Sequence, residues 1–133
     1  MAAYGSAKEM EQVLARMAEL MASDAILIEA SRRTNVTIGY ELRDLGVFFY
    51  TRLMDGSVET GLGELANADM RVVMTSGVFD GIFTGAINPA SAFAMGQLSF
   101  SGNMTAGMRL QGLLRDIGRV YRQAKADCLA EGK

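Results

Sequence analysis

The most informative part of this 133-residue chain runs from Phe79 to Leu114 and reads FDGIFTGAINPASAFAMGQLSFSGNMTAGMRLQGLL. Within it, Asn88 and Pro89 predict the start of a short helix. An Asn side chain accepts a hydrogen bond from a free amide of the first helical turn, and proline fits the first helical position, where the amide it lacks would be unbonded. Gly96 is expected to end this helix after about two turns.

A strand and a long helix are predicted after this short helix. Residues 98–101 read Leu-Ser-Phe-Ser, which has the two-residue period of a strand. Gly102-Asn103 then turns the chain into a last helix, which we expect to carry one apolar stripe from Met104 to Tyr121. A helix capped by Ser76 comes before all of these. The order is therefore helix, short helix, strand, long helix.

This order and these residues resemble the sterol carrier protein type 2 (SCP-2) family of lipid-binding domains. Four motifs in register carry the likeness, and a coarser match of strand order extends it from about Asn35 onward. The motifs are Asn88-Pro89-x-x-Ala92-Phe93, Gly96-x-Leu98, Gly102-Asn103-Met104 and Met108-x-Leu110-Gln111.

The resemblance implies both a fold and a function. The fold is α+β, with a five-stranded, twisted, mainly antiparallel sheet covered by helices on one side and an apolar tunnel between the layers. Members of the family bind sterols, fatty acids and acyl chains without a cofactor, as carriers rather than catalysts. We therefore expect residues 1–133 to form a single SCP-2-like domain, with residues 1–33 as a helical N-terminal extension.

The periodicity of the N-terminal half agrees with this expectation. From Lys8 to Met21 the apolar residues recur at a spacing of three and four, which predicts an amphipathic helix. Ser23-Asp24 can cap a second helix that reaches Arg32. Residues 26–28 are apolar and short enough to be a strand instead, but we favour the helix.

Four strands are predicted next. Successive side chains alternate between an apolar and a polar face, or between two apolar faces, in residues 36–43, 47–54, 57–62 and 70–75. Asp55-Gly56 is a strong signal for a two-residue hairpin turn. The first three strands should therefore form a meander, and the fourth follows a polar loop.

Composition and charge limit the classes of function. Length suggests one domain, and no apolar run reaches the roughly 18 residues that span a bilayer, so we expect a soluble protein. A net charge of −2 gives no reason to expect nucleic-acid binding. A single cysteine, no recognisable secretory signal and a C-terminus unlike the Ser-Lys-Leu peroxisomal address make the cytoplasm the expected compartment.

Catalytic and metal sites are not expected. The chain has no histidine and one cysteine, which removes the commonest general base and the commonest zinc ligands. Asp80 and Glu64 could be imagined as a carboxylate pair, but no motif positions them. The glycine-rich segments match neither a P-loop nor a dinucleotide fingerprint, and we interpret them as turns.

The candidate ligand-binding residues are mostly apolar. An apolar stripe of this kind is also typical of an ordinary core, and the sequence does not separate the residues that face a tunnel from those that only pack. The set is Phe79, Ile82, Phe83, Phe93, Met95, Leu98, Phe100, Met104, Met108 and Gln111.

Gln111 is the one polar candidate. It stands where the resemblance places a glutamine of the last helix against the tunnel, and its amide can donate to and accept from a carboxylate or a hydroxyl. The alternative is an exposed glutamine bonded to water. Ten methionines would suit a wall that adapts to ligands of different shape.

The sequence thus predicts a non-enzymatic intracellular carrier of one apolar ligand, which would be a fatty acid, an acyl chain or a sterol. The arginines of the last helix could favour transient contact with an anionic membrane, although a solvated helix face explains them as well. The alternative is a structural or enzyme-accessory domain of the same fold with a small or closed cavity, for instance one that forms a homodimer through its N-terminal helix.

Overall fold

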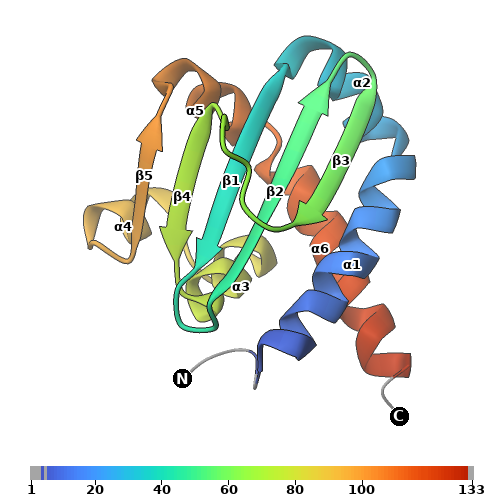
Figure 1. The fold of residues 1–133 in the computed structure, drawn as a ribbon, viewed down its shortest axis with the longest axis vertical. Coiled ribbons are helices and arrows are strands. Elements are labelled where there is room, and N and C mark those ends of the chain that lie inside the picture. Colours follow the sequence, from blue (N-terminus) through green and yellow to red (C-terminus); the bar gives the residue numbers. More distant parts are fainter. Residues whose placement is uncertain (1–3, 5, 132–133) are drawn as a thin grey trace.

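The computed structural model describes residue 4 and residues 6–131. These form a five-stranded sheet with helices on one face (Figure 1). The strands are β1 (Val36–Leu42), β2 (Val47–Met54), β3 (Ser57–Leu62), β4 (Met70–Met74) and β5 (Leu98–Gly102). The helices are α1 (Ala7–Ser23), α2 (Ala25–Thr34), α3 (Ser76–Thr84), α4 (Pro89–Ala94), α5 (Met104–Gln111) and α6 (Leu114–Glu131).

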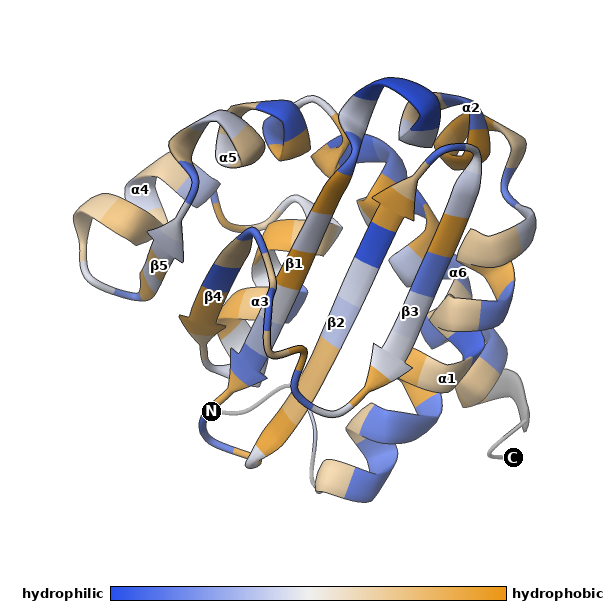
Figure 2. Cartoon of the chain, turned by 45° about the horizontal axis from the view of Figure 1, so that its top comes forward, coloured by the Kyte–Doolittle hydropathy of each residue, from blue (hydrophilic) through white to orange (hydrophobic). Residues whose placement is uncertain are grey.

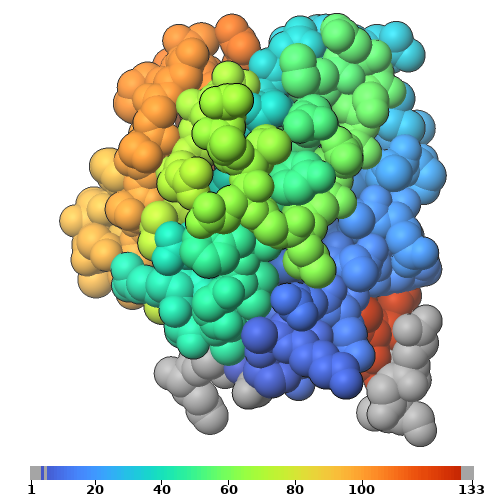
Figure 3. All heavy atoms as spheres, viewed as in Figure 1, coloured from blue at the N-terminus to red at the C-terminus, as the bar shows by residue number. Residues whose placement is uncertain are grey.

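The sheet has the order β3-β2-β1-β4-β5. Three of its four strand pairs are antiparallel and one, β1 with β4, is parallel, so the predicted mainly antiparallel sheet and its meander are present. The parallel pair requires a connection from β3 to β4 across the outer face. Residues 63–69 make it, passing in front of β2 and β1 (Figures 1 and 3). Gly39 lies beneath it, where an added Cβ would be 3.6 Å from the Ala68 Cβ.

The core lies between the inner face of the sheet and the helices. The alternation that predicted the strands places every second residue of β1, β2 and β4 on this face, where these residues are buried. Phe79 of α3 occupies the centre, with edge-to-face ring contacts to Tyr40, Phe49, Phe83 and Tyr121.

Short polar side chains begin most of the helices. The Asn88 and Asn103 carboxamides each accept two backbone hydrogen bonds at the starts of α4 and α5. Asp24 caps α2, which shows that residues 26–28 are helical. For α3 the cap is Thr75 rather than the expected Ser76. The Ser76 hydroxyl instead donates to the Asp44 carboxylate at 2.6 Å, because the β1–β2 turn lies against the start of α3.

The last helix differs from the prediction. Sequence periodicity favours one helix from Met104 through Tyr121, whereas the chain forms α5 and α6 with a break at Gly112 and Leu113. The Leu113 amide bonds to the Leu110 carbonyl three residues back, which tightens the turn and ends the α-helical pattern. Glycine weakens a helix at this point, and burial of Leu113 fixes the bend.

Replacing Gly56 by valine should destabilise the protein by about 1 kcal/mol or more. Asp55 and Gly56 form the two-residue turn between paired Met54 and Ser57 with φ of 49° and 85°, and a β-branched residue is strained at positive φ. Urea unfolding measures the change. Ser57→Val is the control, because it puts the same side chain into an exposed strand position. An unchanged midpoint for Gly56→Val would contradict the turn assignment.

Asp24 should make stability depend on pH. A hydrogen bond from the Arg119 guanidinium, together with the bond from the Leu27 amide, holds the pKa of Asp24 below its usual value. The stabilisation is therefore present above the unfolded pKa of about 3.9 and is lost as the pH falls through the lower folded pKa.

The variant Asp24→Asn keeps a capping side chain but loses the charge. We expect it to lower the free energy of unfolding by roughly 0.5–1 kcal/mol at pH 7 and by less at pH 3. Urea titrations at the two pH values measure this. Glu64→Gln, at an exposed site, is the control. An equal loss at both pH values would contradict the assigned role of the Asp24 charge.

Candidate functional site

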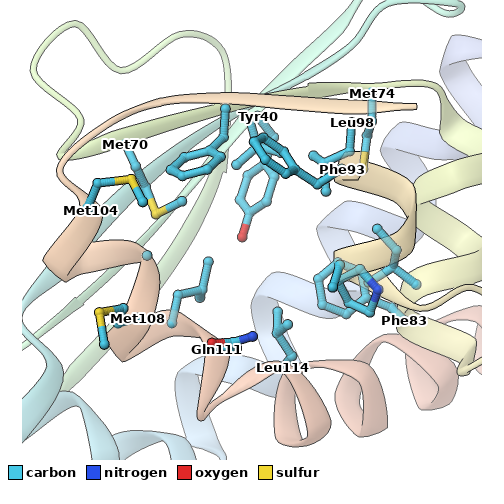
Figure 4. A pocket seen from close by; sticks show the side chains of 17 residues that line it. Tyr40, Met70, Met74, Phe83, Phe93, Leu98, Met104, Met108, Gln111 and Leu114 are labelled. Carbon is cyan, nitrogen blue, oxygen red and sulfur yellow. The ribbon is translucent and has the colours of Figure 1, made fainter. Parts of the chain in front are cut away.

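A cavity of about 280 Å³ lies between the inner face of the sheet, at its β4–β5 edge, and helices α3, α4 and α5 (Figure 4). Fifteen of its seventeen lining residues are apolar or glycine. The lining consists of Tyr40, Met70, Val72, Met74, Ile82, Phe83, Pro89, Ala90, Phe93, Leu98, Phe100, Met104, Gly107, Met108, Leu110, Gln111 and Leu114.

The floor of the cavity comes from the sheet. Val72 of β4 is paired with Phe100 of β5, and Met74 is paired with Leu98, so the four side chains lie on one face. Tyr40 of β1 is beside Val72 in the parallel pair. The two-residue period of three neighbouring strands therefore builds a continuous apolar surface.

Helix α5 forms the opposite wall. Gly107 faces the sheet, and a Cβ built there would be 3.8 Å from both the Met70 and the Phe100 side chains. Because glycine has no side chain, the space in front of it stays open. Arg109 anchors this helix from its other side, with a hydrogen bond of 3.2 Å from its guanidinium to the Thr34 carbonyl of α2.

Two polar side chains, Tyr40 and Gln111, line the cavity. Figure 4 shows the Tyr40 hydroxyl pointing from the sheet toward the interior and the Gln111 amide at the opposite side, where α5 ends. Burial raises the pKa of Tyr40 above its usual value. Its phenol, which is neutral at physiological pH in any case, can act as a hydrogen-bonding group. The arrangement can enclose an apolar body and bond to a polar atom at either side.

The rim of the cavity is apolar and exposed. Phe93 of α4 is 53% exposed, and Met104 and Met108 of α5 are 65% and 73% exposed. Figure 2 shows α4 mainly in hydrophobic colours although it lies at the edge of the molecule. Large apolar side chains that are this exposed to solvent are typical of a surface that contacts a membrane or another protein.

A second hollow adjoins the cavity near Gln111. It shares six lining residues with the cavity, among them Gln111 and Leu114, and is otherwise bounded by the loop between α3 and α4 and by Arg115 and Arg122 of α6. The two spaces therefore meet at the α5–α6 bend.

Eight of the ten sequence-predicted residues line the cavity, namely Ile82, Phe83, Phe93, Leu98, Phe100, Met104, Met108 and Gln111. Phe79 does not, because α3 turns it into the aromatic core, where it is 1% exposed. Met95 does not either, because it follows the last residue of α4 and is 74% exposed.

Sequence reasoning missed the contribution of the earlier strands. Tyr40, Met70, Val72 and Met74 line the cavity but lie outside the stretch from which the candidates were taken. The alternation of residues in their strands indicated that these side chains face the core. It did not indicate that β4 pairs with β5, and this pairing brings them beside Phe100.

Asp80, the imagined catalytic carboxylate, has structural partners instead. The Asp80 carboxylate accepts hydrogen bonds of 2.6 Å from both the Tyr121 hydroxyl and the Lys125 ammonium, so it joins α3 to α6. No group of three metal-ligating side chains occurs among residue 4 and residues 6–131. Over the same residues, no helix combines the length and the apolar character needed to cross a membrane.

Comparison with known proteins gives a family match. Residues 14–115 match the model of the SCP-2 sterol transfer family. The match therefore begins inside α1 and includes all of α2, upstream of the part in which the motifs lie. A search of curated proteins finds no significant match.

Similar solved structures share the fold. The sterol carrier protein domain 2 of Helicoverpa armigera is 19% identical, with a TM-score of 0.68, and the match covers 89% of this chain and 94% of that one. Sterol carrier protein 2 of Yarrowia lipolytica is 18% identical, with a TM-score of 0.62 and coverage of 77% and 87%.

A much longer enzyme also contains a similar region. The inverting sec-alkylsulfatase Pisa1 of Pseudomonas sp. is 19% identical over 65% of this chain, with a TM-score of 0.58. The match covers only 13% of the sulfatase chain. At these identities the likeness concerns the fold alone.

Proposed function

Because this chain belongs to the SCP-2 sterol transfer family, we propose that it is a non-enzymatic carrier that binds one apolar ligand in the cavity beneath β4 and β5 and releases it to a membrane or a partner. The observation that carries the proposal is the lining, which is apolar except for Tyr40 and Gln111. The residues that we assign to ligand contact are those of the lining, including the eight predicted from sequence.

The binding energy would come mainly from burial of the ligand. Each methylene removed from water contributes about 0.8 kcal/mol, so an acyl chain of about sixteen carbons has enough gross transfer energy for micromolar binding after the costs of association. At about 280 Å³ the cavity is near the lower limit for ligand sites, roughly 300–1,000 Å³. This size favours one slender chain over a lipid with two chains.

The methionines of the wall would let the cavity adapt. Met70, Met74, Met104 and Met108 all contribute to the lining, and a thioether chain changes its rotamer at little cost. The exposed rim at Phe93, Met104 and Met108 would then touch the membrane when the ligand enters or leaves. We expect selectivity for chain length to be broad.

Organic extraction of the purified protein, followed by mass spectrometry, tests the carrier function. A carrier should yield lipid from the expression host in near-stoichiometric amount, and the extracted protein should rebind a long-chain acyl probe. Absence of both retained lipid and binding would support the alternative, a structural or interaction domain with an unused cavity.

A second candidate function is that of an accessory domain that presents an apolar substrate to a catalytic chain. The observation that favours it is the similarity to one region of the sec-alkylsulfatase. It predicts that the protein binds lipid but transfers it slowly between vesicles unless a partner enzyme is present. Measuring transfer between donor and acceptor vesicles distinguishes the two functions.

A further inference from the structure

Strand β5 forms an exposed edge of the sheet. The strand order places β3 at one edge and β5 at the other. Helix α1 lies against β3, where the Thr60 hydroxyl donates to the Met21 sulfur and Val58 is buried. In contrast, Ser99 and Ser101 of β5 are exposed, and Figure 1 shows no further strand beyond β5.

The backbone groups of Leu98 and Phe100 point away from the rest of the sheet. These two residues pair with Met74 and Val72 of β4. The Met74 carbonyl accepts a hydrogen bond of 3.0 Å from the Arg43 amide, which follows β1 on the other side of β4. Because backbone groups alternate in direction along a strand, Met74 and Val72 both direct theirs away from β5. The amides and carbonyls of Leu98 and Phe100 therefore have no partner in the sheet and lie along the outer side of β5.

This edge also lacks the features that normally protect an edge strand. Such strands commonly carry a charge, a proline or a bulge, each of which prevents pairing with another strand. Residues 81–108 contain no lysine, arginine, aspartate or glutamate. Strand β5 reads Leu-Ser-Phe-Ser-Gly and pairs with β4 residue by residue, without a bulge. The edge is therefore a template for the addition of a further strand.

The outward backbone groups favour a polypeptide strand over a membrane as the partner of this edge. Hydrocarbon offers no hydrogen bonds, so an open sheet edge is costly in contact with it. A strand that pairs here must also match the two faces of β5, on which Leu98 and Phe100 face the cavity whereas Ser99 and Ser101 face solvent. A second, antiparallel copy of β5 meets both requirements, because opposite residues of an antiparallel pair lie on the same face.

We propose that two copies of this chain associate through β5, antiparallel about a two-fold axis at Phe100, so that their sheets join into one. In this register Phe100 lies opposite Phe100 of the second copy, and Ser99 lies opposite its Ser101. The contact is isologous, as in most homodimers. The helices of both copies then lie on the same face of the joined sheet. Phe93, which is 53% exposed and in ring contact with Phe100, would gain cover from the second copy.

Sedimentation equilibrium of the purified chain and of two double variants tests the inference. Wild type should be a mixture of monomer and dimer in which the dimer fraction rises with concentration. Ser99→Glu with Ser101→Glu should raise the dissociation constant at least about tenfold, because each introduced carboxylate lies opposite another one. Ser99→Lys with Ser101→Glu should keep the dimer, because each introduced lysine lies opposite a glutamate of the second copy.

The two double variants are matched in their effect on the single chain. Both place a glutamate at position 101, beside Arg71 of β4, so neither puts like charges next to each other on paired strands of one copy. Neither serine lines the cavity. Both variants should therefore melt near the temperature of wild type and bind a fluorescent long-chain fatty acid as wild type does.

Three results would overturn the inference. Wild type that stays monomeric at about 1 mM would reject the dimer, and binding of that monomer to phosphatidylcholine vesicles would assign the exposed apolar rim to a membrane instead. Equal dissociation constants for all three proteins would place the dimer contact on another face, such as α1. Loss of the dimer in both double variants would reject the antiparallel pairing of Ser99 with Ser101.

Discussion

Gly107→Leu should weaken binding of a long-chain acyl probe at least tenfold without lowering the stability of the ligand-free protein. The residue lies in α5 and lines the cavity, and a Cβ there meets only the Met70 and Phe100 side chains, at 3.8 Å. A leucine would therefore extend into the space assigned to the ligand. Displacing even two methylenes costs about 1.6 kcal/mol, which is a little more than tenfold in affinity.

The stability of this variant separates an open cavity from a filled core. In a packed core the added volume would cost about 1–3 kcal/mol, whereas replacing a helical glycine by another residue normally stabilises the helix by about 0.5–1 kcal/mol. The melting temperature should therefore stay level or rise. Gly107→Ala is the control, because one methyl fits at 3.8 Å and should leave binding unchanged.

A different outcome would count against the assigned site. If Gly107→Leu melted much earlier than wild type and its folded fraction still bound the probe, then the space in front of α5 would be core. The ligand would have to bind elsewhere.

Phe79→Ala should lower the free energy of unfolding by about 3–5 kcal/mol, a large part of the roughly 5–15 kcal/mol that stabilises a domain. The ring is 1% exposed. It makes edge-to-face contacts at centroid distances of 5.5 Å with Phe49, 4.9 Å with Phe83 and 5.1 Å with Tyr121.

The same variant tests the sequence-based assignment of Phe79 to ligand contact. As a core residue, Phe79 should affect stability and leave probe affinity within a few-fold of wild type in the folded fraction. Met95→Ala is the control at an exposed position. Met95 is 74% exposed, so this substitution should change the free energy of unfolding by less than about 0.5 kcal/mol. Loss of probe binding in a still stable Phe79→Ala protein would return this residue to the ligand site.

Local signals predicted most of the elements. Turn and cap residues act through neighbours in the chain, so Asp55-Gly56, Asn88-Pro89 and Gly102-Asn103 could be interpreted without knowledge of the fold. The alternation in residues 36–54 and 70–74 separated the two faces of each strand for the same reason. The bend at Gly112 was missed, because periodicity continues across it and only the packing of Leu113 requires the change of direction.

The sequence by itself determined the five strands, the starts of α2, α4 and α5, the family and the apolar character of the stretch from Phe79 to Leu114. Each of these features depends on residues that lie close together in the sequence, so it can be recognised without knowledge of the fold. Tertiary structure decided which apolar residues face a cavity: Phe79 and Phe83 are one helical turn apart, yet only Phe83 lines it. It also brought Tyr40 and Met70 beneath α5, and Arg115 and Arg122 beside the end of α3, because strand order and helix packing place residues together that are far apart in the chain.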